Sequence, residues 1–552
     1  MAARKSFFRR PILILILISI VALVVFRKPL LSQLFASDLL GEIAALVYGP
    51  SPEYPPATGR PERVSVDLTQ PAAKVDDRFL SVAVDSSQVA GGHWWSKSAQ
   101  KEGGLGAHRT NPFDFTRPRL IAMARELAPA YLRIGGSEAD VLFYDMSETP
   151  ISPAPGRYDL VFTRKHWDAI NTFAKDTGMS VFFTVNAGLG PRDAAGAWAP
   201  DNARLLLEYS KDRGYDVPVW ELGNEINLFF FLYGRSRAVD GEQYARDFEA
   251  FHKLVREYYP DSKLAGPASF YWPLVGEPAG FLYGVMEGFL QNAGKLVDVV
   301  TWHYYPQQSR RCGMAVRWAT PTRLLDPGNL DEVDKWAAMV EHLRDQYAPQ
   351  AQVWLGEIGN AQCGGEPGVS DRYVGGLWWL DQLGQTARRG EPVIVRQTLS
   401  GSNYGLIDDS DLTPNPDYWN SVLWKRLMGS AVLKAKTTGE NPFVRAYAHC
   451  TPGQCGSVTL LLLNVSPDIK ATVILDEKLT KTGATIWRLT GPRLTGREIR
   501  LNGNPLEMQG DTLPSLDGVP YQFGVTEAIE LEPASYAFVV LPNAGSDACQ
   551  CK

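Results

Sequence analysis

The sequence has few histidines and cysteines and no large excess of either charge. Its 552 residues include 7 His and 6 Cys, and the formal net charge is −6. No group of His, Cys and acidic residues has convincing zinc-site spacing, and no basic stripe or known nucleic-acid-binding motif occurs. These absences predict no metal, no other cofactor and no nucleic-acid partner. A slightly acidic chain also has no overall field that attracts a polyanion.

Long apolar runs are equally scarce, and the exception lies at the N-terminus. Residues 11–26 are apolar except for Ser19, and basic residues flank them on both sides. The run is long for a signal-peptide core and slightly short for a membrane span. We favour an uncleaved signal anchor over a cleaved signal peptide within residues 1–30. The basic excess before the run predicts a cytoplasmic N-terminus, so the remainder would be membrane-anchored outside the cytoplasm, secreted or periplasmic. Residues 31–61 end in a Pro-rich stretch and are expected to be a linker.

The cysteines suit an oxidising compartment, although sequence alone does not choose their pairing. Cys450 and Cys455 flank a Thr-Pro-Gly-Gln turn and can pair locally, or one of them can bond to the C-terminal Cys549-Gln550-Cys551. Cys312 and Cys363 each follow an expected strand and can join two loops. Free thiols are the remaining alternative.

Short apolar runs alternate with helical patterns over residues 77–425. Eight strand-helix repeats predict an α/β fold, a closed (β/α)8 barrel of the TIM type. The expected strands are Phe79–Asp85, Tyr131–Gly135, Val181–Asn186, Val217–Glu225, Leu264–Ser269, Val299–Tyr305, Val353–Glu357 and Val393–Leu399. The expected helices include Arg117–Leu127, Trp167–Lys175, Asn202–Lys211, Glu242–Tyr258, Leu330–Gln346 and Tyr373–Arg388.

Strand patterns alone follow one another over residues 426–552, which is typical of a β-sandwich. Residues 62–76 hold one early strand, and we expect it to join this sandwich, because an unpaired edge strand invites aggregation. The expected C-terminal strands are Val444–Ala448, Ser457–Val465, Thr472–Leu475, Thr485–Leu489, Ala528–Leu531 and Tyr536–Leu541.

Two glutamates end short apolar runs at the fourth and seventh expected strands. Glu225 ends Val219-Trp220-Glu221-Leu222-Gly223-Asn224-Glu225, and Glu357 ends Val353-Trp354-Leu355-Gly356-Glu357. Parallel barrels place their chemistry at this end of the strands, and two carboxylates there can cleave a glycosidic bond. Glu221 is expected lower in the barrel wall. The alternative is that both residues are ordinary surface carboxylates.

These motifs resemble glycoside hydrolase family 79, the family of heparanases and β-glucuronidases, from about residue 62 to the C-terminus. The resemblance implies a barrel with a β-sandwich, a retaining mechanism and no metal. It is carried by Tyr131-Leu132-Arg133-Ile134-Gly135-Gly136, Trp220 to Glu225, Val300-Thr301-Trp302-His303-Tyr304-Tyr305, Trp354 to Glu357, Asn403-Tyr404-Gly405-Leu406-Ile407-Asp408, Pro416-Asp417-Tyr418-Trp419, Leu501-Asn502-Gly503 and Thr512-Leu513-Pro514.

The resemblance also implies residue roles, with Glu225 as general acid/base and Glu357 as nucleophile. Tyr305 would donate a hydrogen bond to the nucleophile, and Tyr404 would belong to the loop from Gly401 that holds a glucuronate carboxylate. The alternative is a capping role for Asp85 and a purely structural role for His303, Gln397 and Tyr404. The expected binding residues are Asp85, Asn224, His303, Tyr305, Gln397 and Tyr404.

The chain departs from the heparanase pattern in three places. The heparanase pattern has a long segment after the second strand that is excised, whereas here a short connector, about Met146–Tyr158, occupies that place. Maturation into two chains is therefore not expected. Ser402 replaces a glycine in the carboxylate loop, and the basic heparan-binding clusters are missing. Basic residues do follow the sixth strand, and they either contact an anionic chain or are solvated loop charges: Arg310, Arg311 and Arg317.

The predicted function is therefore a retaining hydrolase of β-linked glucuronic acid, acting on glycans or glycoconjugates in exo or endo fashion. Its expected partners are a carbohydrate substrate and, through the N-terminal segment, a membrane. The alternatives are a glycosidase of this fold for a neutral β-linked sugar and a non-catalytic glycan-binding protein.

Overall fold

The computed structural model describes residues 52–95, 107–271, 276–277, 284–312, 317–439, 441–481, 483–523 and 528–550. The expected anchor at residues 1–30 and most of the expected linker lie outside these ranges. Across the described ranges, no helix is both long and apolar enough to cross a bilayer.

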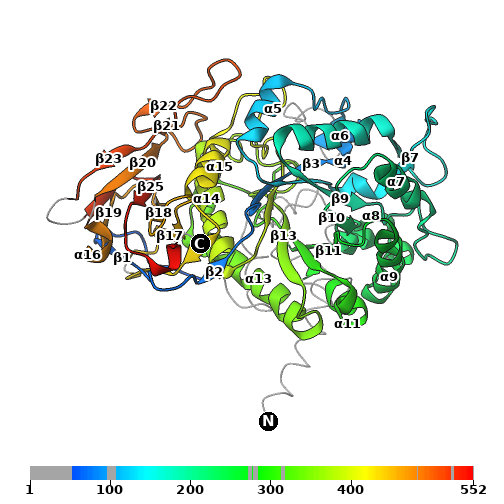
Figure 1. Cartoon of the computed structure of the whole chain (residues 1–552), viewed down its shortest axis with the longest axis horizontal. Coiled ribbons are helices and arrows are strands. Elements are labelled where there is room, and N and C mark those ends of the chain that lie inside the picture. Colours follow the sequence, from blue (N-terminus) through cyan, green and yellow to red (C-terminus); the bar gives the residue numbers. More distant parts are fainter. Residues whose placement is uncertain are drawn as a thin grey trace, which may run out of the picture.

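A closed barrel of eight parallel strands lies at the centre of the molecule (Figure 1). It confirms the predicted (β/α)8 fold, but several strands end earlier than expected, most of all the fourth at Leu222 and the eighth at Arg396. Glu225 and Gln397 therefore lie in the loops just past these strands. In barrel order the strands are β3 (Leu80–Asp85), β6 (Tyr131–Gly135), β9 (Ser180–Val185), β10 (Val219–Leu222), β11 (Lys263–Tyr271), β12 (Val299–Tyr304), β13 (Gln352–Ile358) and β14 (Ile394–Arg396).

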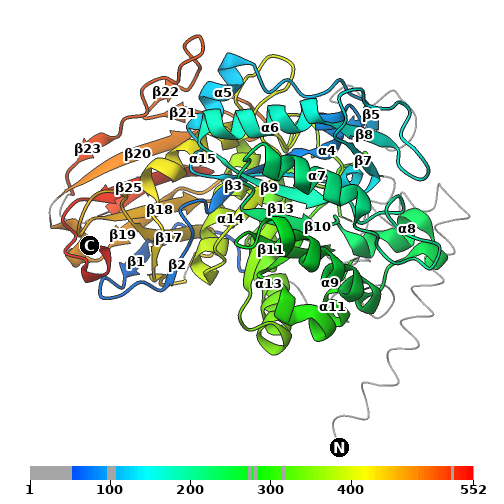
Figure 2. The same cartoon turned by 45° about the vertical axis from the view of Figure 1, so that its right-hand side comes forward.

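Helices cover the outside of the barrel, as the two views in Figures 1 and 2 show. All six predicted helices are present with ends shifted by a few residues, and α11, α15 and the short helices were not predicted. In the described residues the helices of the barrel region are α4 (Ser86–Ala90), α5 (Pro118–Arg125), α6 (Arg164–Thr177), α7 (Asp201–Asp212), α8 (Phe229–Tyr233), α9 (Gly241–Tyr258), α11 (Met286–Ala293), α12 (Pro321–Leu324), α13 (Pro327–Tyr347), α14 (Tyr373–Arg389) and α15 (Pro416–Leu427). The short helix α16 (Glu477–Thr480) lies beside β19 in the C-terminal region (Figure 1).

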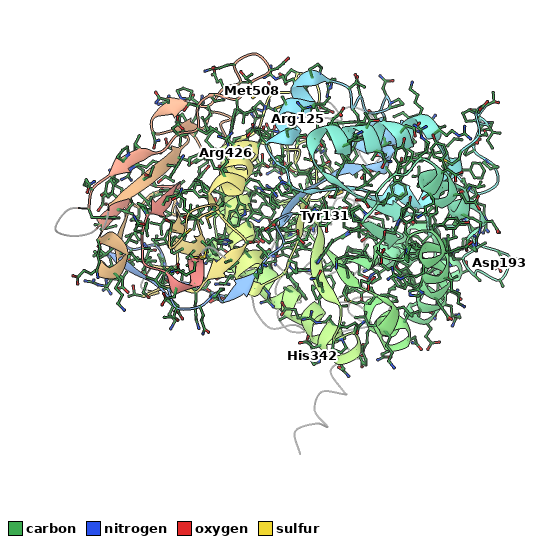
Figure 3. All side chains as sticks on the ribbon, in the orientation of Figure 1. Arg125, Tyr131, Asp193, His342, Arg426 and Met508 are labelled. Atoms are coloured by element: carbon green, nitrogen blue, oxygen red, sulfur yellow. A yellow bond between two sulfur atoms is a disulfide. The ribbon has the colours of Figure 1, made fainter. Side chains whose placement is uncertain are left out.

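The lower interior of the barrel is apolar. Figure 3 labels Tyr131, the first residue of β6, within the barrel, and its ring centroid lies 5.1 Å from that of Trp354. Inward-facing side chains of successive strands fill this layer, so the barrel is a packed core. Polar side chains occupy the next layer toward the carboxyl ends of the strands. The apolar layer consists of Ala83, Tyr131, Phe182, Val219, Ala265, Val299, Trp354, Val393 and Val395.

The C-terminal region forms two further sheets. One has four strands in the order β16-β1-β19-β24, and the other has nine strands that include β2, β15, β17, β18, β20 and β25. Apolar side chains of both sheets belong to one buried cluster, to which β1 contributes Val64. The strands are β1 (Glu62–Val66), β2 (Ala73–Lys74), β15 (Ala431–Leu433), β16 (Ala435–Thr437), β17 (Val444–Cys450), β18 (Val458–Asn464), β19 (Ala471–Leu475), β20 (Ala484–Thr490), β21 (Arg500–Leu501), β22 (Asn504–Pro505), β23 (Val519–Tyr521), β24 (Ala528–Leu531) and β25 (Ser535–Leu541).

Disulfides join distant loops. Cys312 bonds to Cys363, and Cys450 bonds to Cys549 near the C-terminus. Cys455 is also disulfide-bonded. The local pairing of Cys450 with Cys455 is therefore wrong, because Cys450 has another partner. The free-thiol alternative is wrong for these five cysteines.

Candidate active site

A buried arginine on β6 connects the polar residues at the mouth of the barrel. Arg133 donates from Nε and Nη2 to Glu221 Oε2 at 3.0 and 2.9 Å. Thr184 and Thr301 donate to the two oxygens of Glu221, each at 2.8 Å. Both oxygens of Glu221 therefore accept hydrogen bonds inside the barrel wall, deeper than the two candidate catalytic glutamates, as expected. These contacts fix the orientation of the Arg133 guanidinium.

Glu357 reaches the interior because β13 contains a bulge. Thr301 pairs with Trp354, but His303 pairs with Glu357, so the register shifts by one residue at Gly356. Simple alternation from Trp354 would point Glu357 outward, and the extra residue reverses this. Glu357 Oε2 then accepts from Arg133 Nη1 at 2.8 Å, and Oε1 accepts from the Tyr305 hydroxyl at 2.6 Å. Two such donors suit an anionic carboxylate.

Glu225 lies in a sharp turn after β10. Its φ is 50°, which is uncommon outside glycine, and its N–H donates to the carbonyl of Ala268 at 3.0 Å. Glu225 Oε1 lies 3.2 Å from His303 Nδ1. Burial, followed by the negative charge of Glu357, raises the pKa of Glu225 well above its usual value. Burial lowers the pKa of His303, so this contact does not need a charged imidazole.

Asn224 is oriented so that its amide nitrogen is available for a ligand. Its Oδ1 accepts from Arg133 Nη2 at 2.9 Å and from the N–H of Gly136 at 3.1 Å. The N–H of Asn224 donates to Asp140 Oδ2 at 2.9 Å, which holds the backbone of this turn. With the oxygen occupied, Nδ2 is the group that can donate to a sugar hydroxyl.

Asp85 and Gln397 form a second polar pair beside the two glutamates. Asp85 caps α4 by accepting from the N–H of Ser87 at 2.9 Å, and Gln397 Nε2 donates to Asp85 Oδ2 at 3.3 Å. The capping interpretation of Asp85 thus has a structural basis, and its binding role stays a prediction. Burial raises the pKa of Asp85 to about 6. A Cβ on Gly136 would lie 1.9 Å from Asp85 Oδ2, so only glycine leaves room for this carboxylate.

An aromatic wall closes one side of the site. Trp94, Phe270, Tyr305 and Tyr404 form one buried cluster, with Trp95 and Leu228 packed against it. Trp94 belongs to β4 (His93–Trp95), in the loop that follows α4. Gln397 interacts with the Tyr404 side chain, which links this wall to the Asp85 pair.

The loop from Gly401 to Tyr404 is held against the loop after β13. Ser402 Oγ and the N–H of Asn403 both donate to the carbonyl of Gly364, each at 2.8 Å. Ser402 has a φ of 57°, so the serine that replaces a glycine still adopts the left-handed conformation. The hydrogen bond from the Ser402 hydroxyl to Gly364 offsets part of the free-energy cost of that conformation.

Three ionisable side chains come close enough to share a cation. Glu225, His303 and Glu357 each have one ligand atom within 4.8 Å of the others. However, the Arg133 guanidinium already binds Glu357 Oε2, and its Nη2 lies 3.3 Å from His303 Nε2. A positively charged protein group therefore already occupies the position beside these donors.

The structure brings all the predicted site residues to one end of the barrel. Sequence reasoning did not assign Arg133 to the site. A single arginine within an otherwise apolar barrel strand could have indicated a buried, functional cation. Sequence reasoning also did not assign Trp94, whose position depends on a loop. The gathered residues are Asp85, Asn224, Glu225, His303, Tyr305, Glu357, Gln397 and Tyr404. Their chemical roles stay predictions.

Similarity to known proteins identifies the family. The profile of the glycosyl hydrolase family 79 N-terminal domain matches residues 62–384. Heparanase of Mus musculus is 31% identical over 93% of this chain and 98% of its own length. Heparanase-like protein 1 of Arabidopsis thaliana is 31% identical over 86% of this chain and 92% of its own length. The chain belongs to glycosyl hydrolase family 79, and it is a glycosidase, a hydrolase that acts on glycosyl bonds.

Two further similarities bear on activity and on fold. Inactive heparanase-2 of Homo sapiens is 28% identical over 88% of this chain and 89% of its own length. An α-L-arabinofuranosidase from Thermotoga maritima superposes with a TM-score of 0.60 at 16% identity, over 87% of this chain and 99% of that one. The latter similarity supports the barrel fold alone.

Proposed function

We propose that the protein is a retaining β-glucuronidase that uses Glu357 as nucleophile and Glu225 as acid/base. The observation that carries this proposal is the unequal environment of the two carboxyl groups. Glu357 accepts from a guanidinium and a phenol, whereas burial and the negative charge of Glu357 favour the protonated form of Glu225. Two carboxyl groups whose surroundings differ in this way suit a nucleophile and an acid.

Their separation supports retention of configuration. A ligand oxygen of each carboxylate lies within 4.8 Å of the other. Retaining glycosidases have carboxyl groups about 5 Å apart, whereas inverting enzymes leave room for a water molecule between them.

The reaction follows in two steps. A Glu357 oxygen attacks the anomeric carbon while Glu225 gives its proton to the glycosidic oxygen, which leaves as an alcohol. Glu225, now ionised, takes a proton from water, whose oxygen attacks the same carbon and displaces Glu357. Asn224 Nδ2 donates to a sugar hydroxyl beside that carbon in both steps.

The uronate carboxylate would bind at the loop from Gly401 to Tyr404. Residues 402–404 form a turn, and the backbone N–H groups of this loop and the Tyr404 hydroxyl are the donors that such binding would use. Backbone amides and a phenol can bind one carboxylate through directed hydrogen bonds. Asp85, with a pKa of about 6, and Gln397 would contact ring hydroxyls.

We further propose that residues 77–425 form the catalytic domain, and that residues 426–552 with strand residues 62–76 form a β-sandwich. The disulfides favour a compartment outside the cytoplasm. We also propose that residues 1–30 anchor the protein to a membrane. Comparing membrane and soluble fractions of the full chain with those of a chain that begins at residue 31 tests it.

A panel of aryl glycosides tests the function. We expect hydrolysis of the β-glucuronide with retained configuration, little hydrolysis of the β-glucoside, and none by Glu357→Ala. Treatment with an activated 2-fluoro-glucuronide should label Glu357. A label on Glu221 or Glu225 would refute the assignment, and preference for the glucoside would favour a neutral-sugar glycosidase.

The non-catalytic alternative has one specific basis, the similarity to an inactive heparanase-2. Both glutamates and their hydrogen-bonding partners are present here, which favours catalysis. Glucuronide binding without turnover by the wild-type protein would support the non-catalytic alternative.

A further inference from the structure

The loop that follows β12 directs an arginine at the back of the proposed carboxylate-binding loop. Arg311 Nη2 donates to the carbonyls of Gly364 and Gly365 at 3.0 and 2.5 Å, and to Asn403 Oδ1 at 3.0 Å. One guanidinium nitrogen thereby bridges the loop after β13 and the loop after β14.

Disulfide bonding fixes both ends of this contact. Cys312 directly follows Arg311, Cys363 directly precedes Gly364, and these two cysteines are bonded. The closeness of the loops also depends on glycine. A Cβ on Gly365 would lie 2.8 Å from the backbone nitrogen of Tyr404, and one on Gly364 would lie 2.4 Å from Ser402 Oγ.

The position of Arg311 also has an electrostatic consequence. The three acceptors of Nη2 are neutral oxygens, and the carboxylates of Glu366 and Asp371 lie near enough to interact electrostatically with the guanidinium. The charge is near enough to Tyr404 for each to affect the pKa of the other. In a partly buried setting, a cation behind a set of amides strengthens their attraction for an anion.

We propose that Arg311, fixed by the Cys312–Cys363 disulfide, makes the site selective for an acidic sugar over its neutral counterpart. Arg311 is a positioning residue, because it acts through the loop from Gly401 to Tyr404. This inference rests on the proposed β-glucuronidase function and names a determinant of its selectivity.

Neighbouring Arg310 provides a matched control. Its side chain is 61% exposed, lies 3.8 Å from Glu366 Oε1, and covers the Trp318 ring. Replacing it removes the same charge from the same loop without removing the contacts to Gly364, Gly365 and Asn403.

The test measures kcat and KM for an aryl β-glucuronide and the matching β-glucoside, with melting temperatures for every variant. For Arg311→Gln we expect a glucuronide kcat/KM at least about tenfold lower, mostly through KM, and a glucoside kcat/KM within about threefold of wild type. Arg311→Lys should recover part of the loss, and Arg310→Gln should change neither value. Equal loss on both substrates, or no loss, would overturn the proposal.

Two further measurements cover the remaining outcomes. If glucoside turnover is too slow to measure, inhibition constants of glucuronate-configured and glucose-configured iminosugars replace the kinetic ratio. The double variant Cys312→Ser/Cys363→Ser should lower the same ratio, whereas Cys450→Ser/Cys549→Ser should not. A wild-type enzyme that prefers the glucoside would refute the proposed function itself, which is a different result from an unchanged ratio in Arg311→Gln.

Discussion

At the scale of single residues, the two glutamates differ because of what surrounds them. Arg133 and Tyr305 donate to the two oxygens of Glu357, whereas Glu225 contacts His303 in a buried position. Arg133 also touches Glu221 and Asn224. One side chain thus orients three of the polar groups of the site, and replacing it would disturb all of them together.

We predict that Glu225→Gln removes the alkaline limb of the pH–rate profile of kcat/KM. The raised pKa of Glu225 keeps its carboxyl protonated to a higher pH than that of an ordinary glutamate, and rates fall once that proton is lost. Glycosides with poor leaving groups should lose roughly a hundredfold or more in kcat/KM, because they need proton donation most. Measurements with a nitrophenyl and an alkyl glucuronide check this, with Glu391→Gln as a buried-carboxyl control that keeps the limb. Equal loss for both substrates would mean that Glu225 is not the acid.

At the scale of elements, the barrel wall also contains buried carboxyl groups that belong to no catalytic contact. Glu391 lies between α14 and β14 and accepts from Trp302 Nε1 at 3.1 Å. Burial raises its pKa from 4.5 to about 8. The indole bond joins the segment that leads into β14 to β12, so this carboxyl links two neighbouring parts of the barrel wall.

We predict that Glu391→Gln stabilises the protein increasingly as the pH rises from 5 to 8. The folded pKa lies above the unfolded one, so the native state retains a proton that the unfolded chain releases. The stability contributed by the protonated group is complete below about pH 4.5 and is lost as the pH approaches 8. Glutamine can still accept from the indole but cannot ionise. The melting-temperature gain should be about 2 °C or more larger at pH 8 than at pH 5. A pH-independent difference would contradict this.

At the scale of the whole molecule, the C-terminal sheets contact the loops of the catalytic barrel. Arg497, in the loop between β20 and β21, donates from Nη2 to Asp371 Oδ2 at 3.1 Å and to Asp408 Oδ2 at 3.0 Å. Asp371 Oδ2 also accepts from Asn403 Nδ2 at 3.4 Å. A residue outside the barrel is therefore connected to the proposed carboxylate-binding loop.

We predict that Arg497→Gln lowers both stability and glucuronide hydrolysis. It leaves two nearly buried carboxylates without their shared cation, which should cost roughly 2 kcal/mol, since the arginine itself is one-third exposed. The glucuronide KM should rise through Asn403. Denaturant unfolding and steady-state kinetics check this against Arg500→Gln, whose exposed pair with Glu498 should contribute little. Unchanged kinetics in a destabilised Arg497→Gln would mean that the C-terminal sheets stabilise the barrel without affecting substrate binding.

The sequence by itself predicted the barrel and most of the polar residues that gather at one end of it. Strand and helix patterns are local, and the period of apolar residues predicted all eight strands and put Glu225 and Glu357 at one end of the barrel. The predicted ends of β10 and β14 were less accurate. The strand-like pattern continues through Asn224-Glu225 and through Gln397, but these residues lie in loops whose conformation depends on tertiary contacts.

Tertiary structure alone decided what the two glutamates touch. The bulge at Gly356 turns Glu357 inward, and it depends on pairing between β12 and β13. The contact of Arg133 with Glu357 joins positions 224 residues apart, and that of Arg311 with Asn403 joins positions 92 apart. The disulfides likewise join residues that only the closed fold brings together, since sequence spacing carries no information about which distant side chains meet.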